Sequence, residues 1–354
     1  MTFLMKTVYI FFFTFFLFFN FTNKLISYEN KFVVKNIEIA EEFNLNFSKE
    51  TVIEKAFKKG FFDILYQTLQ SKDFEKIKNT KLNEIKPLIE NFKIKEEKFK
   101  DNKYFAKFDI NFNKVKIYSF LKKKNLFFSI PNKINIVFFP IIVDHNKNIL
   151  FTENIFYKNW QNKKDNNHLI NYILPIEDIE DLNNLLSNTE NLEQFDMSNI
   201  SNKYNSQNYI LAIIYKSNDK LNIYSKIKLN KKKINSNFLI NSFNMKDDKL
   251  INTYVTQLKI HYEDLWKKNN QINTSIKLSL QIFFPNSEFK KIKDFEKKLN
   301  EIELVNSFSI KEFNLKQNIY EIIYNGSPDI LMSKFTDHNI PLIYKNERWV
   351  YSEK

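Results

Sequence analysis

The clearest fold signal in the chain is YFAKFDINFNKVKIYSFLKKKNLFF, residues 104–128. Its first part alternates inward and outward side chains, which predicts a strand with one buried face. Asp101-Asn102 is a two-residue turn signal, so residues 93–100 should pair with this strand as a hairpin. Its second part predicts a helix over residues 114–124, because apolar side chains recur at helical spacing. These are Val115, Ile117, Tyr118 and Leu121.

Three further elements are expected before this hairpin. Residues 32–40 read as a strand and residues 48–69 as an amphipathic helix. A second helix is predicted over residues 82–92. With the apolar run 126–128, the order becomes strand, helices, hairpin, helix and strand.

The end of the chain repeats this plan and gives a β-α-β-β-α-β order. At one offset of 214 residues (339 minus 125), apolar positions and an Asn coincide. We interpret this as a duplicated split-βαβ unit. The coinciding pairs are Ile117 with Leu331, Leu121 with Phe335, Asn125 with Asn339, Leu126 with Ile340, and Phe128 with Leu342. The predicted elements are a strand at 276–284, a helix at 288–299, a hairpin of 304–313 with 319–324, a helix at 328–338 and a strand at 342–344.

The middle of the chain has a different pattern. Its apolar runs predict strands that are covered on both faces, as in a layered α/β domain. The strands are expected at 134–143, 170–174 and 209–215, with 221–229 as a hairpin partner, and the helices at 179–186, 197–204 and 249–267. Residues 161–168 and 230–236 are polar enough to be predicted as surface loops.

We therefore expect an α+β protein with an α/β middle domain. Its predicted parts are a targeting segment at 1–27, an N-terminal α+β domain at 28–131, a middle α/β domain at 132–272 and a C-terminal α+β domain at 273–354.

The targeting segment has Lys6 before an apolar run over residues 8–21. This run of about 14 residues suits a signal peptide better than a spanning helix, which needs ~20. Three interpretations of this segment stay open: a cleaved signal peptide, an uncleaved membrane anchor and a buried helix. Met5 is a possible initiator methionine. The predicted location is the periplasm, or the inner membrane with the body facing the periplasm. Membrane contact is expected only through this segment.

Composition excludes several functions. The chain has no Cys, so disulfides, thiolate metal sites and lipid-modified Cys are excluded. Gly60 and Gly326 are its only glycines, which excludes Gly-rich phosphate loops. The net charge of +13 comes almost wholly from Lys, and the one Arg is Arg348. Base readout relies on Arg, so no specific nucleic-acid partner is expected.

Few residues suggest a site. Asp144-His145 follows a predicted buried strand, where α/β sheets bind ligands, although this is also ordinary turn chemistry. Asp178 and Asp181 belong to an acidic group that could supply a pair of catalytic carboxylates. Capping of the predicted helix explains the same residues. Trp160 is a large aromatic anchor that suits either a core or an interface.

The four His residues predict no metal site. None has a ligand partner at helical spacing, so each is expected in a turn or on the surface. His261 and Asp264 should share a helix face as an ordinary pair, with Glu263 pointing away. We expect no catalytic residue, cofactor or metal ligand. The His residues are His145, His168, His261 and His338.

Four segments of the chain resemble the bacterial family catalogued as domain of unknown function 2066. They are Phe138-Phe139-Pro140, Asn154-Ile155-Phe156 with Trp160, LPIEDIEDLNNLL (174–186) and NKYNSQNYILA (202–212). The chain departs from that family at Ile155 and Phe156, where Pro and Trp are usual, and at Asn205, where Gly is usual. The resemblance implies a signal-bearing envelope protein without assigned activity. It also implies a middle domain similar to the amino-terminal domain of the Tol-Pal propeller protein, and to flagellar and penicillin-binding-protein accessory proteins.

The expected function is that of a non-enzymatic envelope accessory protein that binds another envelope protein, in an unspecified oligomeric state. One alternative is a hydrolase or lyase with its site at the end of strand 134–143. Another is a cell-wall or lipid-contacting module that uses the Lys-rich faces.

Overall fold

The protein is described by a computed structural model that covers residues 32–144, 147–160, 168–187, 189–217, 219–230, 232–241, 247–272, 276–285, 289–313 and 317–352. The fold is mixed α+β with open sheets, as the sequence predicts. Residues 1–27, the predicted targeting segment, and residues 161–167 lie outside the described part. Among the described residues, no helix is long and apolar enough to cross a membrane.

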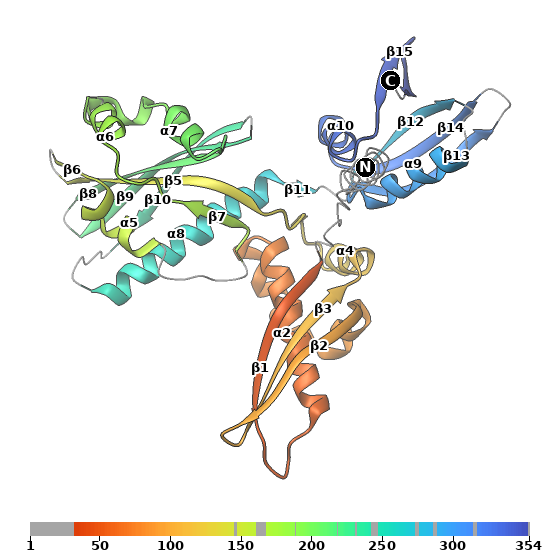
Figure 1. Cartoon of the computed structure of the whole chain (residues 1–354), viewed down its shortest axis with the longest axis horizontal. Coiled ribbons are helices and arrows are strands. Elements are labelled where there is room, and N and C mark those ends of the chain that lie inside the picture. Colours follow the sequence, from red (N-terminus) through yellow and green to blue (C-terminus); the bar gives the residue numbers. More distant parts are fainter. Residues whose placement is uncertain are drawn as a thin grey trace, which may run out of the picture. The chain divides into compact units, whose positions relative to one another are not determined.

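The first unit follows the predicted order (Figure 1). Its antiparallel sheet has the strand order β1-β3-β2, and the turn at Asp101-Asn102 has positive φ at both residues, as a tight hairpin requires. The elements are β1 (Val33–Glu42), α2 (Lys49–Thr68), a 3-10 turn (Ser71–Lys76), α3 (Leu82–Ile85), a 3-10 turn (Lys86–Leu88), β2 (Ile89–Lys100), β3 (Lys103–Phe112), α4 (Lys114–Lys123) and β4 (Phe128–Ser129).

The prediction of a helix over residues 82–92 is correct only at its start, because α3 ends at Ile85 and a short 3-10 turn follows. Pro87 lies in the short 3-10 turn after α3, and the chain then turns into β2, where Ile89 pairs with Phe112. Pro cannot donate its backbone nitrogen within a helix, so the helical apolar pattern ends there. The hairpin is longer than expected for this reason.

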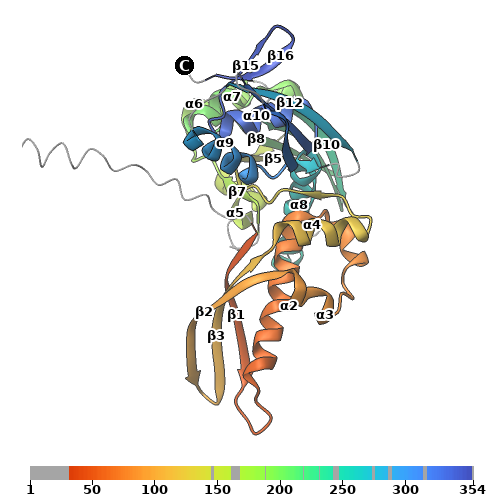
Figure 2. The ribbon, with the colours of Figure 1, turned by 90° about the vertical axis from the view of Figure 1, so that its right-hand side faces the viewer.

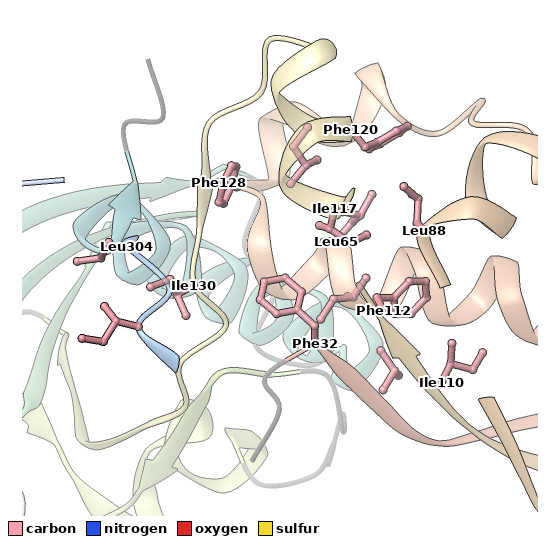
Figure 3. Packing of buried hydrophobic residues seen from close by; sticks show 14 of the residues in the cluster. Phe32, Leu65, Leu88, Ile110, Phe112, Ile117, Phe120, Phe128, Ile130 and Leu304 are labelled. Atoms are coloured by element: carbon pink, nitrogen blue, oxygen red, sulfur yellow. The ribbon is translucent and has the colours of Figure 1, made fainter. Parts of the chain in front are cut away.

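Helix α2 lies close against this sheet. A Cβ on Gly60 would stand 2.8 Å from Ile37 Cδ1, so a larger residue would force the Ile37 side chain to shift. Figure 3 shows Leu65 of α2, Phe112 of β3 and Ile117 of α4 among the buried side chains of this core. The buried face of β3 is the alternating face that the sequence predicts.

The second unit has β12 (Lys277–Pro285), α9 (Phe289–Glu301), β13 (Val305–Phe313), β14 (Gln317–Asn325), α10 (Pro328–Asp337), β15 (Leu342–Lys345) and β16 (Arg348–Tyr351). Its sheet order is β13-β14-β12-β16-β15. Strand β16 was not predicted from the sequence; it lies beside β12 in parallel and pairs with β15 in antiparallel orientation.

The two units are equivalent in detail at the predicted offset. Helices α4 and α10 begin and end 214 residues apart (328 minus 114 and 337 minus 123). Asn113 and Ser327 cap them in the same way, each accepting from the backbone N–H three residues on. Asn125 and Asn339 both follow with positive φ, 53° and 50°. These shared features support a duplication.

The middle part contains a six-stranded sheet of order β10-β9-β8-β5-β6, with β7 also on β5. Strand β5 is parallel to β7 and β8, and the other pairs are antiparallel. The elements are β5 (Ile134–Asp144), β6 (Lys147–Ile149), a 3-10 turn (Phe151–Glu153), α5 (Ile155–Trp160), β7 (Ile170–Ile173), α6 (Ile179–Leu186), a 3-10 segment (Thr189–Gln194), α7 (Ser198–Lys203), β8 (Tyr209–Ser217), β9 (Lys220–Leu229), β10 (Lys232–Ile240) and α8 (Asp248–Asn269).

Strands β5 and β8 of this sheet are buried on both faces over most of their length, as predicted. Phe138 of β5 packs in one core with α5 and α8, whereas its neighbours Val137 and Phe139 pack in a second core with α6 and α7. Figures 1 and 2 show helices on both faces of this sheet. The prediction of a surface loop over 230–236 is wrong, because β10 begins at Lys232 and pairs with β9 along its whole length. Polar side chains suit this strand because it forms the edge of the sheet.

The middle part is inserted into a hairpin of the first unit. Strand β11 (Gln271–Ile272) pairs with β4, with Phe128 opposite Ile272. At the offset of 214, Phe128 corresponds to Leu342, which pairs with Tyr351 of β16. Strand β11 is therefore the counterpart of β16. The predicted domain boundaries stay predictions, although each of the three larger sheets draws its strands from one predicted range.

The equivalence predicts equal effects of equivalent substitutions. Asn125→Ala and Asn339→Ala should each lower the free energy of unfolding by about 1 kcal/mol, because Ala tolerates positive φ poorly. Asn125→Gly and Asn339→Gly should not destabilise the protein, since Gly adopts this conformation freely. Urea unfolding measures both pairs. A loss at one position only would contradict the equivalence of the two helix ends.

Candidate functional site

Asp144 ends strand β5 as predicted, but it is held in an ion pair. Lys216 Nζ lies 2.5 Å from Asp144 Oδ2, and the two residues are opposite each other in β5 and β8. His145 lies outside the described residues. The structure thus gives Asp144 a partner within the sheet.

Asp178 and Asp181 serve helix α6. Asp178 is its N-cap and accepts from the backbone N–H groups of Glu180 and Asp181, both at 3.0 Å. The hydrogen bond from Asp181 N, together with that from Glu180 N and the nearby Lys203, lowers the pKa of Asp178. Asp181 is buried and accepts from Lys203 Nζ at 2.7 Å. The capping interpretation therefore accounts for both carboxylates.

The structure does not bring Asp144 together with this acidic group. Lys203, which binds both carboxylates, is three residues before Ser206, whose hydroxyl donates to Asn135 O at the amino end of β5. Asp144 is at the other end of that strand. At ~3.3 Å per residue, the nine steps from Asn135 to Asp144 (144 minus 135) span about 30 Å.

Trp160 belongs to the core. Its ring stacks on Phe138 with the centroids 3.7 Å apart, and the residue is 2% exposed. Lys259 Nζ donates to Trp160 O at 2.6 Å and lies 5.4 Å from the ring centroid. Trp160 is thus a packing anchor between α5 and α8.

Sequence reasoning missed a buried charge network on α8. Glu263 is buried, and its Oε1 accepts from Leu169 N at 2.9 Å and lies 2.8 Å from His168 Nδ1. Lys267 Nζ is 3.7 Å from Glu263 Oε2, and burial lowers the pKa of Lys267. The network joins α8 to the start of β7.

In the same region His261 and Asp264 each have another hydrogen-bond partner, although the charge of Asp264 still acts on His261. His261 Nε2 contacts Ser236 Oγ at 2.8 Å, whereas Asp264 accepts from the backbone N–H of Ser71 at 2.9 Å. The sequence did contain a signal for this network. A spacing of four residues places three charged side chains on one helix face, namely Lys259, Glu263 and Lys267. It was missed because charged residues are usually assigned to the solvated face.

An apolar surface cluster was also missed. We define the apolar tip as Phe43, Leu45, Phe47 and Phe99. Phe43 packs on Phe47 and Phe99 with centroid distances of 4.9 and 5.0 Å. Phe43 is 51% exposed, Phe99 is 63% exposed and Leu45 is fully exposed.

The apolar tip is built from two segments. Phe43 N donates to Asn102 O at 2.8 Å, so the β1–α2 loop is bound to the turn between β2 and β3. Figures 1 and 2 show this loop and this turn at the same end of the unit. The sequence signal for the apolar tip was the presence of three large apolar residues in a short loop after a predicted strand. These are Phe43, Leu45 and Phe47. Clustered exposed apolar side chains mark interaction sites.

Neither the family models nor the curated proteins contain a match to this chain. The resemblance to domain of unknown function 2066 therefore stays a prediction. Within the described residues, no group of three or more His, Asp or Glu side chains could hold a metal ion.

The buried network predicts a large loss of stability. Glu263→Ala should lower the free energy of unfolding by about 3–5 kcal/mol, because it leaves Lys267 buried without its carboxylate partner. The double variant Glu263→Leu/Lys267→Met should recover most of that loss. Urea unfolding measures the stability of both variants. Glu180→Ala is the control, because Glu180 is exposed and its loss should leave the midpoint of unfolding unchanged. A double variant no more stable than Glu263→Ala would contradict this account.

Proposed function

We propose that this chain is a non-enzymatic envelope accessory protein that binds another envelope protein. The observation that carries the proposal is the apolar tip, where Phe43, Leu45 and Phe99 are exposed together at the end of the first unit. Exposed aromatic side chains are the usual anchors of protein interfaces.

The candidate polar residues support a binding role over a catalytic one. Asp144 is paired with Lys216, Asp178 caps α6, and Asp181 is paired with Lys203. A hydrolase or lyase that used Asp144 with Asp178 or Asp181 would need them around one substrate, and they are bound to lysines at opposite ends of β5.

The envelope location rests on the apolar segment over residues 8–21 after Lys6. We propose that the body works in the periplasm, either free or attached to the inner membrane by this segment.

The proposal also includes kinship with domain of unknown function 2066 and a middle domain like the amino-terminal domain of the Tol-Pal propeller protein. Asn205 supports the kinship, because it stands where that family has Gly and its φ is 52°. That conformation favours Gly, and Asn is the residue that most readily replaces it. A mixed sheet with helices on both faces supports the likeness of the middle domain.

A photo-cross-linking residue at Leu45 tests the proposal in cells. We expect a discrete cross-linked protein partner, and Phe99→Ser should reduce its yield because it removes a 63% exposed aromatic side chain of the apolar tip. Ile179→Ser is the matched control, since Ile179 is 79% exposed on α6, outside the apolar tip. Its cross-linking yield should stay unchanged.

Two outcomes would contradict the proposal. One is the recovery of no protein partner from Leu45. The other is binding of vesicles made of envelope lipids that Phe99→Ser abolishes, which would indicate the lipid-contacting alternative.

A further inference from the structure

The two equivalent units differ at one edge of their sheets. In the second unit, β12 pairs with β14 on one side and with β16 on the other. In the first unit, β1 pairs with β3 and forms the edge of its sheet. Strand β11, the counterpart of β16, pairs with β4 and not with β1. Among the described residues, no strand therefore fills beside β1 the position that β16 fills beside β12.

The register shows which residues of β1 correspond to those of β12. Ile37 pairs with Phe108, and Leu280 pairs with Ile322, the residue 214 positions after Phe108. Ile37 thus corresponds to Leu280, an offset of 243 (280 minus 37). Strand β16 pairs with Ile282 and Phe283. Their counterparts in β1 are Ile39 and Ala40.

The open edge presents backbone groups at alternate residues. Phe43 N donates to Asn102 O on the β3 side, whereas Glu38 O accepts from Lys59 Nζ at 3.1 Å. Residues of an antiparallel strand alternate between facing their partner and facing away from it. The backbone groups of Glu38, Ala40 and Glu42 therefore face away from β3. Those of Ala40 and Glu42 can pair with a further strand, and Glu38 O can do so when Lys59 Nζ releases it.

The charge of this edge restricts the occupant. Three of its last five residues are acidic, namely Glu38, Glu41 and Glu42. Glu38 is bound to Lys107 at 3.2 Å and Glu41 to Lys55, and Glu42 makes no ion pair among the described residues. Opposite charges on neighbouring strands stabilise pairing, so Lys or Arg is favoured in an added strand. Strand β16 itself carries Arg348, whose guanidinium carbon lies 4.8 Å from the Phe283 ring centroid.

The edge is continuous with the apolar tip, because Glu42 directly precedes Phe43. A strand added in the orientation of β16 would run parallel to β1, and its carboxyl end would reach the apolar tip. An apolar residue at that end would contact Phe43 and Leu45.

We propose that the open edge of β1 over residues 38–42 binds an extended segment of the partner protein as an added parallel strand. In that segment Lys or Arg lies opposite the glutamates, and an apolar residue follows at the apolar tip. This inference rests on the proposed function and names the kind of partner. Pairing of this sort takes its affinity from backbone hydrogen bonds and its specificity from side chains.

The probe is a fluorescein-labelled peptide that alternates Lys with Val and ends in Phe, titrated into the full-length chain and followed by fluorescence anisotropy. Ala40→Pro should weaken its binding about tenfold or more, because it removes an outward N–H and blocks the edge. The N–H of Ala40 faces away from β3, so Pro is tolerated there as on other edge strands. Ala40→Val is the matched control and should bind as the unaltered chain does.

Two further variants keep the test decisive even if Ala40→Pro fails to fold. Lys59→Ala uncovers Glu38 O and should bind the probe at least as tightly as the unaltered chain. Glu38→Lys/Glu42→Lys should weaken the probe about tenfold or more and favour a second peptide that alternates Glu with Val and ends in Phe.

The outcomes separate this inference from the proposed function. Equal binding of both peptides to the unaltered chain, or full binding by Ala40→Pro, would overturn the edge site. A cross-linked partner at Leu45 would then still support the proposed function. Dimerisation of the chain that Ala40→Pro abolishes, without probe binding, would assign the edge to a second copy and overturn the peptide site.

Discussion

The third strand of each terminal unit is the element on which the rest of that unit depends. Strands β3 and β14 each pair on both sides, with the first strand of the unit and with the hairpin partner. Their apolar faces, which include Phe108 in one and Ile322 in the other, are buried. Because side chains alternate along a strand, a slip of one residue would turn this face to solvent. The helix after each strand contributes side chains to the same core, and α4 and α10 coincide in length, cap and end.

The middle part obeys a different constraint, since β5 and β8 are buried on both faces. Such strands need helices on two sides, and α5 with α8 supplies one layer while α6 with α7 supplies the other. Helix α8 also carries Glu263 and Lys267 inward. A buried ion pair of this kind adds little net stability, but it penalises any arrangement in which one charge loses its partner. It therefore fixes how α8 meets the start of β7.

The distribution of polar and apolar side chains is what shapes the functional proposal. Carboxylates that looked available in the sequence are bound within the fold, as Asp181 is by Lys203. Apolar side chains that could have been buried are exposed, as Leu45 is at the apolar tip. The same end of the first unit also leaves a strand edge open where the second unit has β16. Both features belong to the surface that we propose binds another chain.

The sequence by itself determined the element order, the covered faces and the repeat, because strand and helix periods are local properties of the chain. It identified the hairpin at Asp101-Asn102 and the equivalence of Asn125 with Asn339 for that reason. The helix predicted over residues 82–92 was wrong because a Pro ended the helical pattern. The loop predicted where β10 lies was wrong because an edge strand tolerates polar residues. Only the tertiary structure decided that Glu263 is buried, that Asp144 and Asp178 are apart, that β11 is the counterpart of β16, and that β1 is an open edge. These depend on contacts between residues far apart in the chain, and no local pattern carries that information.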